Sequence, residues 1–204
     1  MSELDKLNDM YIDVLREIGN IGTGNATTAI SNMLNLKMDM SVPKVELMPV
    51  EKLGGAIGSE DEVVVGIMLG VEADIDGSMM FIMDEKSAHR MVNLLMMRDR
   101  DSMDPFTEMD LSALMEIGNI IAGSYLSAIS GLTNLTISPT VPSVSIDMAA
   151  AILSVPAVQF GLVSDRALMI KTEIGGDNQI DGYFILMPDE ESFSKILSSL
   201  GVSI

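Results

Sequence analysis

The chain has 204 residues, enough for one large or two small domains, and carries 30 acidic against 12 basic residues for a formal net charge of −18. We therefore expect no nucleic acid as a partner, because phosphate neutralisation needs clustered Lys and Arg. There is no cysteine and only one histidine, which excludes disulfides, thiolate chemistry and the usual zinc sites. No secretory signal and no apolar run of membrane-spanning length is apparent, so we expect a cytoplasmic protein without membrane insertion.

One stretch of the chain occurs twice, since residues 16–31 correspond to residues 115–130 at a spacing of 99 residues. The identical pairs include Glu17/Glu116, Gly19/Gly118, Asn20/Asn119, Gly24/Gly123, Ala29/Ala128 and Pro43/Pro142. So many identities at one spacing indicate an internal duplication. We predict a single domain built from two repeats, residues 1–98 and 107–204, with a joint at residues 99–106.

Later matching positions, such as Asp84 and Asp189, are 105 residues apart instead of 99, so the second half contains six additional residues between about Val144 and Ile180. The apolar stretch from Asp147 to Leu153 is the strongest candidate for this insertion.

The first predicted element is a long helix over residues 2–33, which begins with Ser2 and Asp5 in the arrangement of a capping box. Three glycines, Gly19, Gly22 and Gly24, lie inside this helix, where each costs roughly 1 kcal/mol relative to Ala. They favour close packing of another element against the helix, and a kink is the alternative.

The other elements of the first half follow from the change in hydrophobic period and from turn residues. In order they are an extended segment over residues 36–50 interrupted at Pro43, a turn or short helix at 51–57, a strand at 63–71, a hairpin turn at Asp76-Gly77, a strand at 78–83 and a helix capped by Asp84.

The second half repeats this order, with Thr107 and Asp110 capping its long helix and strands over residues 135–146. Three or so strands per half are marginal alone. We therefore predict a mixed α/β fold of the α+β kind. Its two halves share one continuous sheet about a pseudo-two-fold axis, and the two long helices lie together on one face.

Each long helix carries the same short polar set: Asp13, Glu17 and Asn20 in the first copy, and Ser112, Glu116 and Asn119 in the second. Positions i, i+4 and i+7 share one narrow strip of a helix. A solvated face with local hydrogen bonds is the plain interpretation of one copy. Two copies favour function, because helix propensity would not select Asn beside Gly twice.

The chemistry of this set is limited by the amide, which does not titrate and is neither a base nor a nucleophile. It can orient water, and phosphoryl transfer to water is a reaction in which positioning supplies most of the catalysis. An exposed strip, in contrast to a deep pocket, points to a protein substrate.

Two other candidate sites are less convincing. His89 has no histidine counterpart in the second half, and we interpret it as a surface helix residue. The glycines from Gly22 to Gly24 imitate a dinucleotide motif, but that motif follows a strand and opens a helix. Here they lie within a helix, and the second copy has Ile121 in place of Gly22.

The spacing of Asp or Ser, Glu, Asn and a later Pro resembles that of the CheC, CheX and FliY family of chemotaxis phosphatases. Both copies satisfy this pattern, with Pro43 and Pro142 each 23 residues beyond the Asn. Two intact copies are most similar to the CheC-type members.

The resemblance implies that phosphorylated CheY is the substrate. Asn20 and Asn119 would orient the attacking water, and Glu17 and Glu116 would pair with a Lys of CheY. Asp13, Pro43, Ser112 and Pro142 would support the motif. The chain would need no cofactor of its own, because the magnesium ion would belong to CheY.

The resemblance also implies binding of the receptor deamidase CheD. We assign this binding to the insertion, with Asp147, Ala150 and Leu153 as contacts, while filling of the core is the alternative. A non-catalytic adaptor that docks CheY or CheD is the alternative to the phosphatase as a whole.

Overall fold

The computed structural model describes residues 3–35, 37, 39–160, 166–175 and 180–201, and the side chains among them except those of residues 3–12, 43 and 157–160. The helices are α1 (Glu3–Leu34), α2 (Leu53–Ile57), α3 (Glu85–Leu95), α4 (Glu108–Thr133), α5 (Ala149–Phe160) and α6 (Glu190–Ser199), with a 3₁₀ turn η1 (Val50–Lys52). The strands are β1 (Met40–Pro49), β2 (Val63–Ala73), β3 (Gly77–Asp84), β4 (Ile137–Pro139), β5 (Ser143–Met148), β6 (Arg166–Ile174) and β7 (Ile180–Pro188).

All seven strands form one sheet in the order β1-β6-β7-β3-β2-β4, and β5 also pairs with β2. Every pairing is antiparallel. The repeats exchange edge strands, because β1 of the first half pairs with β6 of the second, and β4 and β5 of the second pair with β2 of the first. The predicted continuous sheet is confirmed.

The pseudo-two-fold axis passes through the centre of this sheet. Met80 of β3 pairs with Ile185 of β7, and these two residues are equivalent positions of the two repeats at the spacing of 105. The neighbouring pair Phe81 and Phe184 continues the same register. Neither half therefore completes its own sheet.

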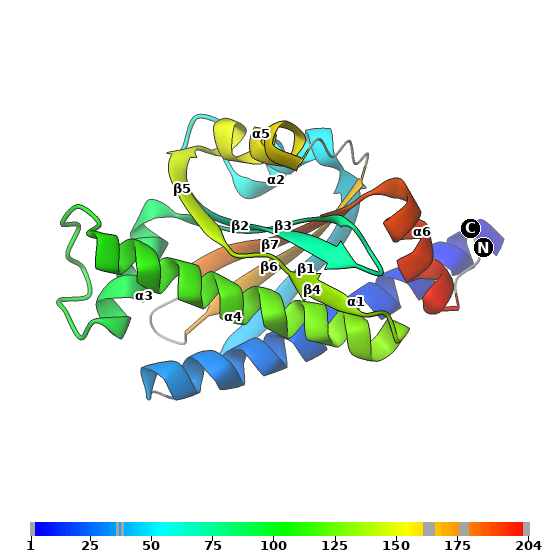
Figure 1. Cartoon of the computed structure of the whole chain (residues 1–204), viewed down its shortest axis with the longest axis horizontal. Coiled ribbons are helices and arrows are strands. Elements are labelled where there is room, and N and C mark those ends of the chain that lie inside the picture. Colours follow the sequence, from blue (N-terminus) through cyan, green and yellow to red (C-terminus); the bar gives the residue numbers. More distant parts are fainter. Residues whose placement is uncertain (1–2, 36, 38, 161–165, 176–179, 202–204) are drawn as a thin grey trace.

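Helices cover both faces of the sheet, with α1 and α4 on one face and α2 and α5 on the other (Figure 1). The larger hydrophobic cluster lies between the sheet and the layer of α1 and α4, and includes residues of α3 and α6. A smaller cluster, which includes Leu53 and Ile152, lies under α2 and α5. Figure 1 shows α3 and α6 at opposite ends of the long-helix layer. No helix in the described part of the chain is long and apolar enough to cross a membrane.

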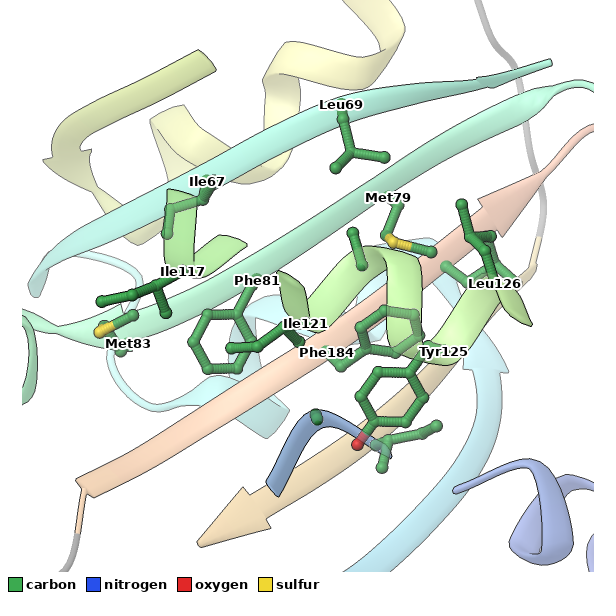
Figure 2. Packing of buried hydrophobic residues seen from close by; sticks show 14 of the residues in the cluster. Ile67, Leu69, Met79, Phe81, Met83, Ile117, Ile121, Tyr125, Leu126 and Phe184 are labelled. Carbon is green, nitrogen blue, oxygen red and sulfur yellow. The ribbon is translucent and has the colours of Figure 1, made fainter. Parts of the chain in front are cut away.

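The two long helices meet at Tyr125, which is fully buried. Its ring stacks on Phe184 of the sheet with centroids 4.0 Å apart (Figure 2). A Cβ added to Gly22 of α1 would lie 2.4 Å from Cδ1 of Tyr125. The Tyr125 hydroxyl is 2.7 Å from Oγ1 of Thr23 and 3.3 Å from Oγ1 of Thr172. One side chain thus joins α1, α4 and the sheet, and burial raises its pKa, although both threonine hydroxyls act in the opposite direction.

The structure corrects two expectations and confirms a third. Gly22 packs closely as predicted, but a Cβ on Gly24 would meet no atom within 4 Å, so Gly24 has no packing role. His89 is buried, not on the surface, and stacks on Phe106 with centroids 3.9 Å apart. The buried face of α3 therefore includes His89 in addition to the apolar residues that the sequence pattern indicated.

The N-terminus of α4 has the predicted capping box, in which the Asp110 backbone N–H donates to Oγ1 of Thr107 and the Thr107 backbone N–H donates to Oδ2 of Asp110. Nη1 of Arg98, the last residue of the first repeat, lies 2.9 Å from Oδ1 of Asp110, whose side chain is only 3% exposed. The proposed cap of α1 at Ser2 lies outside the described residues. Asp84 and Asp189 cap α3 and α6 by accepting from Ser87 and Ser192.

We predict that Gly22→Ala destabilises the protein by about 1–3 kcal/mol, because the added methyl overlaps the Tyr125 ring. Urea unfolding measures the change. Gly24→Ala on the same helix is the matched control, and removing a mid-helix Gly there should stabilise the protein by up to about 1 kcal/mol. Equal effects of the two substitutions would contradict the packing role of Gly22.

We predict that Asp110→Asn destabilises the protein by about 1 kcal/mol at pH 7, through loss of the charged cap. Burial alone would raise the Asp110 pKa, but the Thr107 backbone N–H, the Arg98 guanidinium and the Thr107 hydroxyl together lower it. A lowered folded-state pKa contributes stability above the unfolded pKa, near 4, that is lost as pH falls through the folded value.

The difference in unfolding free energy between the wild type and Asp110→Asn should therefore shrink below about pH 4. Glu108→Gln, which removes an exposed charge from the same helical turn, is the control and should show little of this dependence. A constant difference between pH 7 and pH 3 would rule out the charged cap as the cause.

Candidate functional site

The polar set of α1 lies on the solvent face of the helix. Asp13, Glu17 and Asn20 are all exposed. The opposite face holds the core residues Leu15, Ile18, Ala26 and Ile30, each at most 5% exposed. The polar set is therefore on the solvent-facing side of α1, as the hydrophobic period of the sequence predicted.

The polar set of α4 has the same placement, with Ser112, Glu116 and Asn119 exposed and Leu114, Ile117 and Ile121 buried. Within the described residues, the side chains of Asn20, Asn119, Glu17 and Glu116 make no hydrogen bond or ion pair. The local hydrogen bonds of the plain interpretation are therefore absent among the described residues, whereas the exposure of these side chains agrees with its solvated face. Both amides and both carboxylates remain available to a partner.

The glycine before each Asn sets the height of the helix above the sheet. A Cβ on Gly19 would lie 3.2 Å from Cγ2 of Val45 and 3.5 Å from Cγ1 of Val42, both in β1. A Cβ on Gly118 would lie 2.3 Å from Cγ2 of Ile67 in β2. Each helix therefore rests directly on a strand at this point, and the neighbouring Asn, about 100° further around the helix, is exposed.

One motif proline lies within edge strand β1, and the other lies between the edge strands β4 and β5. Pro43 falls at the register shift of β1 between Ser41 and Lys44. Pro142 lies in the gap between β4 and β5, which both pair with β2. Proline cannot donate to a ladder, so an irregular edge position suits it. Val42 and Val45, which lie closest to Gly19, stand on either side of Pro43 in the sequence.

The two sites differ in their neighbours. Arg16 lies 2.9 Å from Asp13 in an exposed ion pair, whereas the second site has Met115 and Ser112 at these positions. Exposed pairs of this kind contribute about 0–1 kcal/mol to stability. The ion pair at the first site therefore has little effect on folding stability. It changes the charged groups that the first site presents to a partner, compared with the second site.

Neither polar set lines the hollow that the described residues form beside α3. That hollow is lined by Lys86, Arg90, Arg100, Asp101 and Met103, none of which belongs to the motif. Among the described residues, no group of three His, Cys, Asp or Glu side chains could hold a metal ion. The motif residues present an amide and a carboxylate on a convex helix surface.

The predicted insertion begins at the end of β5 and continues as α5. Asp147 and Ala150 are exposed, and Leu153 is half-buried against the smaller hydrophobic cluster. The segment thus fills core through Ile152 and Leu153 and also presents exposed residues. Sequence reasoning did not single out Tyr125 or its hydroxyl contacts, since nothing local in the sequence shows which groups meet across two helices and a strand.

Residues 10–47 and 109–146, the two segments that carry the polar sets, match the model of the CheC-like family. The chain is also 36% identical over 209 aligned residues to the CheY-P phosphatase CheC of Bacillus subtilis (strain 168), with 100% of both chains covered. The chain belongs to the CheC-like family. The family resemblance seen in the motifs is thereby confirmed.

Solved structures of low sequence identity share the fold of this CheC-like chain. Thermotoga maritima FliY is 22% identical with a TM-score of 0.74, covering 93% of this chain and 95% of that one. CheX in the CheX–CheY–BeF3–Mg complex from Borrelia burgdorferi is 20% identical with a TM-score of 0.51, covering 83% of this chain and 96% of that one. The predicted fold class is confirmed by these similarities and by the shared sheet.

Proposed function

We propose that this CheC-like chain is a phosphatase that hydrolyses the aspartyl phosphate of phosphorylated CheY, with Asn20 and Asn119 orienting the attacking water. One observation carries the proposal: each long helix presents an exposed Glu and Asn whose side chains have no partner within the described chain. The full-length similarity to a CheY-P phosphatase supports the same substrate.

The reaction needs little from this chain beyond positioning. Water oxygen forms a bond to phosphorus, the bond from phosphorus to the aspartate oxygen breaks, and inorganic phosphate and a free carboxylate result. A phosphoryl transition state of loose character spreads charge over the phosphoryl oxygens, so alignment of the nucleophile is the main requirement. The amide oxygen of Asn20 or Asn119 accepts a hydrogen bond from the water and fixes its direction of attack.

Because each motif amide lies on an exposed helix surface, the substrate must supply the remaining groups of the active site. An amide on an exposed helix can reach a phosphoryl group only if the partner opens its own active site toward the helix. The partner therefore supplies the phosphorylated carboxylate together with its magnesium ion. Glu17 and Glu116, one helical turn before each Asn, pair with a cationic side chain, which we assign to a Lys of CheY.

We expect Asn20→Ala/Asn119→Ala to reduce phosphate release from phosphorylated CheY by about 100-fold or more, by analogy with removal of a positioned amide in other enzymes. Asn25→Ala, at another exposed position of α1, is the matched control and should act as wild type. The single variants Asn20→Ala and Asn119→Ala measure how much of the total phosphatase activity each site contributes.

Binding of beryllofluoride-loaded CheY should survive in the double variant, because the carboxylates remain. Its stability should not fall, since Ala is favoured over Asn inside an exposed helix by up to about 0.7 kcal/mol. A double variant with wild-type phosphate release would eliminate the water-orienting role. Binding by the wild type without any turnover would support the adaptor alternative.

We also propose that the surface of α5 binds CheD, with Asp147, Ala150 and Leu153 as contacts. The exposure of Asp147 and Ala150, and the absence of a helix of this length at the matching place in the first half, support it. Leu153 contributes only its outer part, because it packs against the smaller hydrophobic cluster.

We expect Ala150→Glu to weaken CheD binding by about tenfold or more, since it places a charge in an apolar contact. Isothermal titration calorimetry measures the affinity. Asn32→Glu adds the same charge at an exposed position of α1, on the other face of the sheet, and should leave the affinity unchanged. Unaltered affinity in a correctly folded Ala150→Glu protein would remove α5 as the CheD surface.

A further inference from the structure

Gly24 and Gly123 are equivalent residues of the two repeats, each four positions after the motif Asn. Both lie inside long α-helices, where a Gly costs about 1 kcal/mol relative to Ala. A Cβ added at either position would meet no atom within 4 Å. Neither has the positive φ that would require glycine.

Packing therefore explains the other motif glycines but not this pair. Gly19 and Gly118 are in contact with strands, and Gly22 is in contact with the Tyr125 ring. Gly24 and Gly123 face open space and still occur in both halves. Packing within the described chain gives no reason for glycine at these two equivalent positions. Gly131 also faces open space, but its equivalent in the first half is Asn32, so it lacks this repetition.

Helix geometry shows what a side chain would do there. The Cα–Cβ bonds of a helix tilt toward its N-terminus, so the side chain of residue i+4 covers the surface over residue i. A side chain at position 24 would lean over Asn20, and one at position 123 over Asn119. Glu17 and Glu116 lie on the N-terminal side of each Asn and lean away from it.

The residues three positions after each motif Asn also leave access to its amide open. Thr23 is buried and directs its hydroxyl to Tyr125, and Ala122 is buried with only a methyl group. Each amide is thus uncovered on its C-terminal side. This is the side from which a phosphoryl group and its water can reach the amide without contact with Glu.

We infer that Gly24 and Gly123 are specificity-determining positions that keep the motif amides open and let the main chain of the regulator come against the helix. The inference rests on the proposed function, because it concerns access to the same Asn residues. It assigns to each site a backbone contact surface one turn beyond the Asn, where a side chain would hold the regulator away.

The test compares Gly24→Ala/Gly123→Ala and Gly24→Leu/Gly123→Leu with the wild type. Both double variants should be more stable than wild type in urea unfolding, since each replaces a mid-helix Gly in open space. Their kcat/KM for phosphorylated CheY should nevertheless fall, modestly for Ala and by about tenfold or more for Leu. Affinity for beryllofluoride-loaded CheY should fall in the same order.

Gly131→Leu is the matched control, because Gly131 is an exposed glycine of α4 where an added Cβ would meet no atom within 4 Å. It lies about 120° around the helix from Asn119. It should gain stability and retain wild-type kcat/KM and affinity. Wild-type kcat/KM and affinity in the Leu double variant would overturn the inference.

The Asn variants and the Gly variants are expected to lose different properties. Asn20→Ala/Asn119→Ala should lose turnover and keep binding, whereas the Leu double variant should lose binding. If the wild type binds loaded CheY without turnover, the water-orienting proposal fails and the affinities alone decide the glycine inference. If the wild type does not bind loaded CheY, both are overturned.

Discussion

The contact between Tyr125 and the backbone of Gly22 is the interaction on which the arrangement of the molecule depends. Its ring lies on the backbone of α1, stacks on Phe184 of the sheet and directs its hydroxyl to Thr23 and Thr172. A buried aromatic residue contributes a large apolar area together with one polar group that must find a partner. Here the partners come from both layers, so the relative position of the two motif helices is fixed by a single satisfied side chain.

The crossing also shows how a duplicated chain departs from symmetry in its core. The equivalents of Gly22 and Tyr125 are Ile121 and Ala26, which are also buried, so at each of these two equivalent position pairs α1 has the smaller residue and α4 the larger one. Two identical faces would place two glycines or two bulky side chains opposite each other, leaving a cavity or an overlap. The core therefore diverged while the exposed polar sets remained alike. The exchange of edge strands makes each half dependent on the other, since β1 and β5 complete the sheet of the opposite repeat.

This division between an asymmetric core and two similar surfaces matters for function. The glycine before each motif Asn lets the helix lie close to a strand, and the Asn, about 100° further around the helix, is exposed to solvent. An amide in such a place has nothing to act on within its own chain. Its chemistry begins only when another molecule completes the site, which distinguishes this arrangement from an enzyme that encloses a small substrate. Arg16 and Met115 give the two completed sites different rims.

The sequence by itself determined those features that arise from local periodicity and from repetition. Helical spacing placed Glu17 and Asn20 on an outward strip, the capping residues Thr107 and Asp110 marked the start of α4, and the duplication implied a shared sheet. Only the tertiary structure decided which groups meet across elements. It buried His89 against Phe106, placed the Tyr125 ring against Gly22, and left open space beside Gly24. The physical reason is that the hydrophobic period of a segment shows which face of the helix or strand a residue occupies. The residues packed against that face come from distant segments, and no local pattern specifies them.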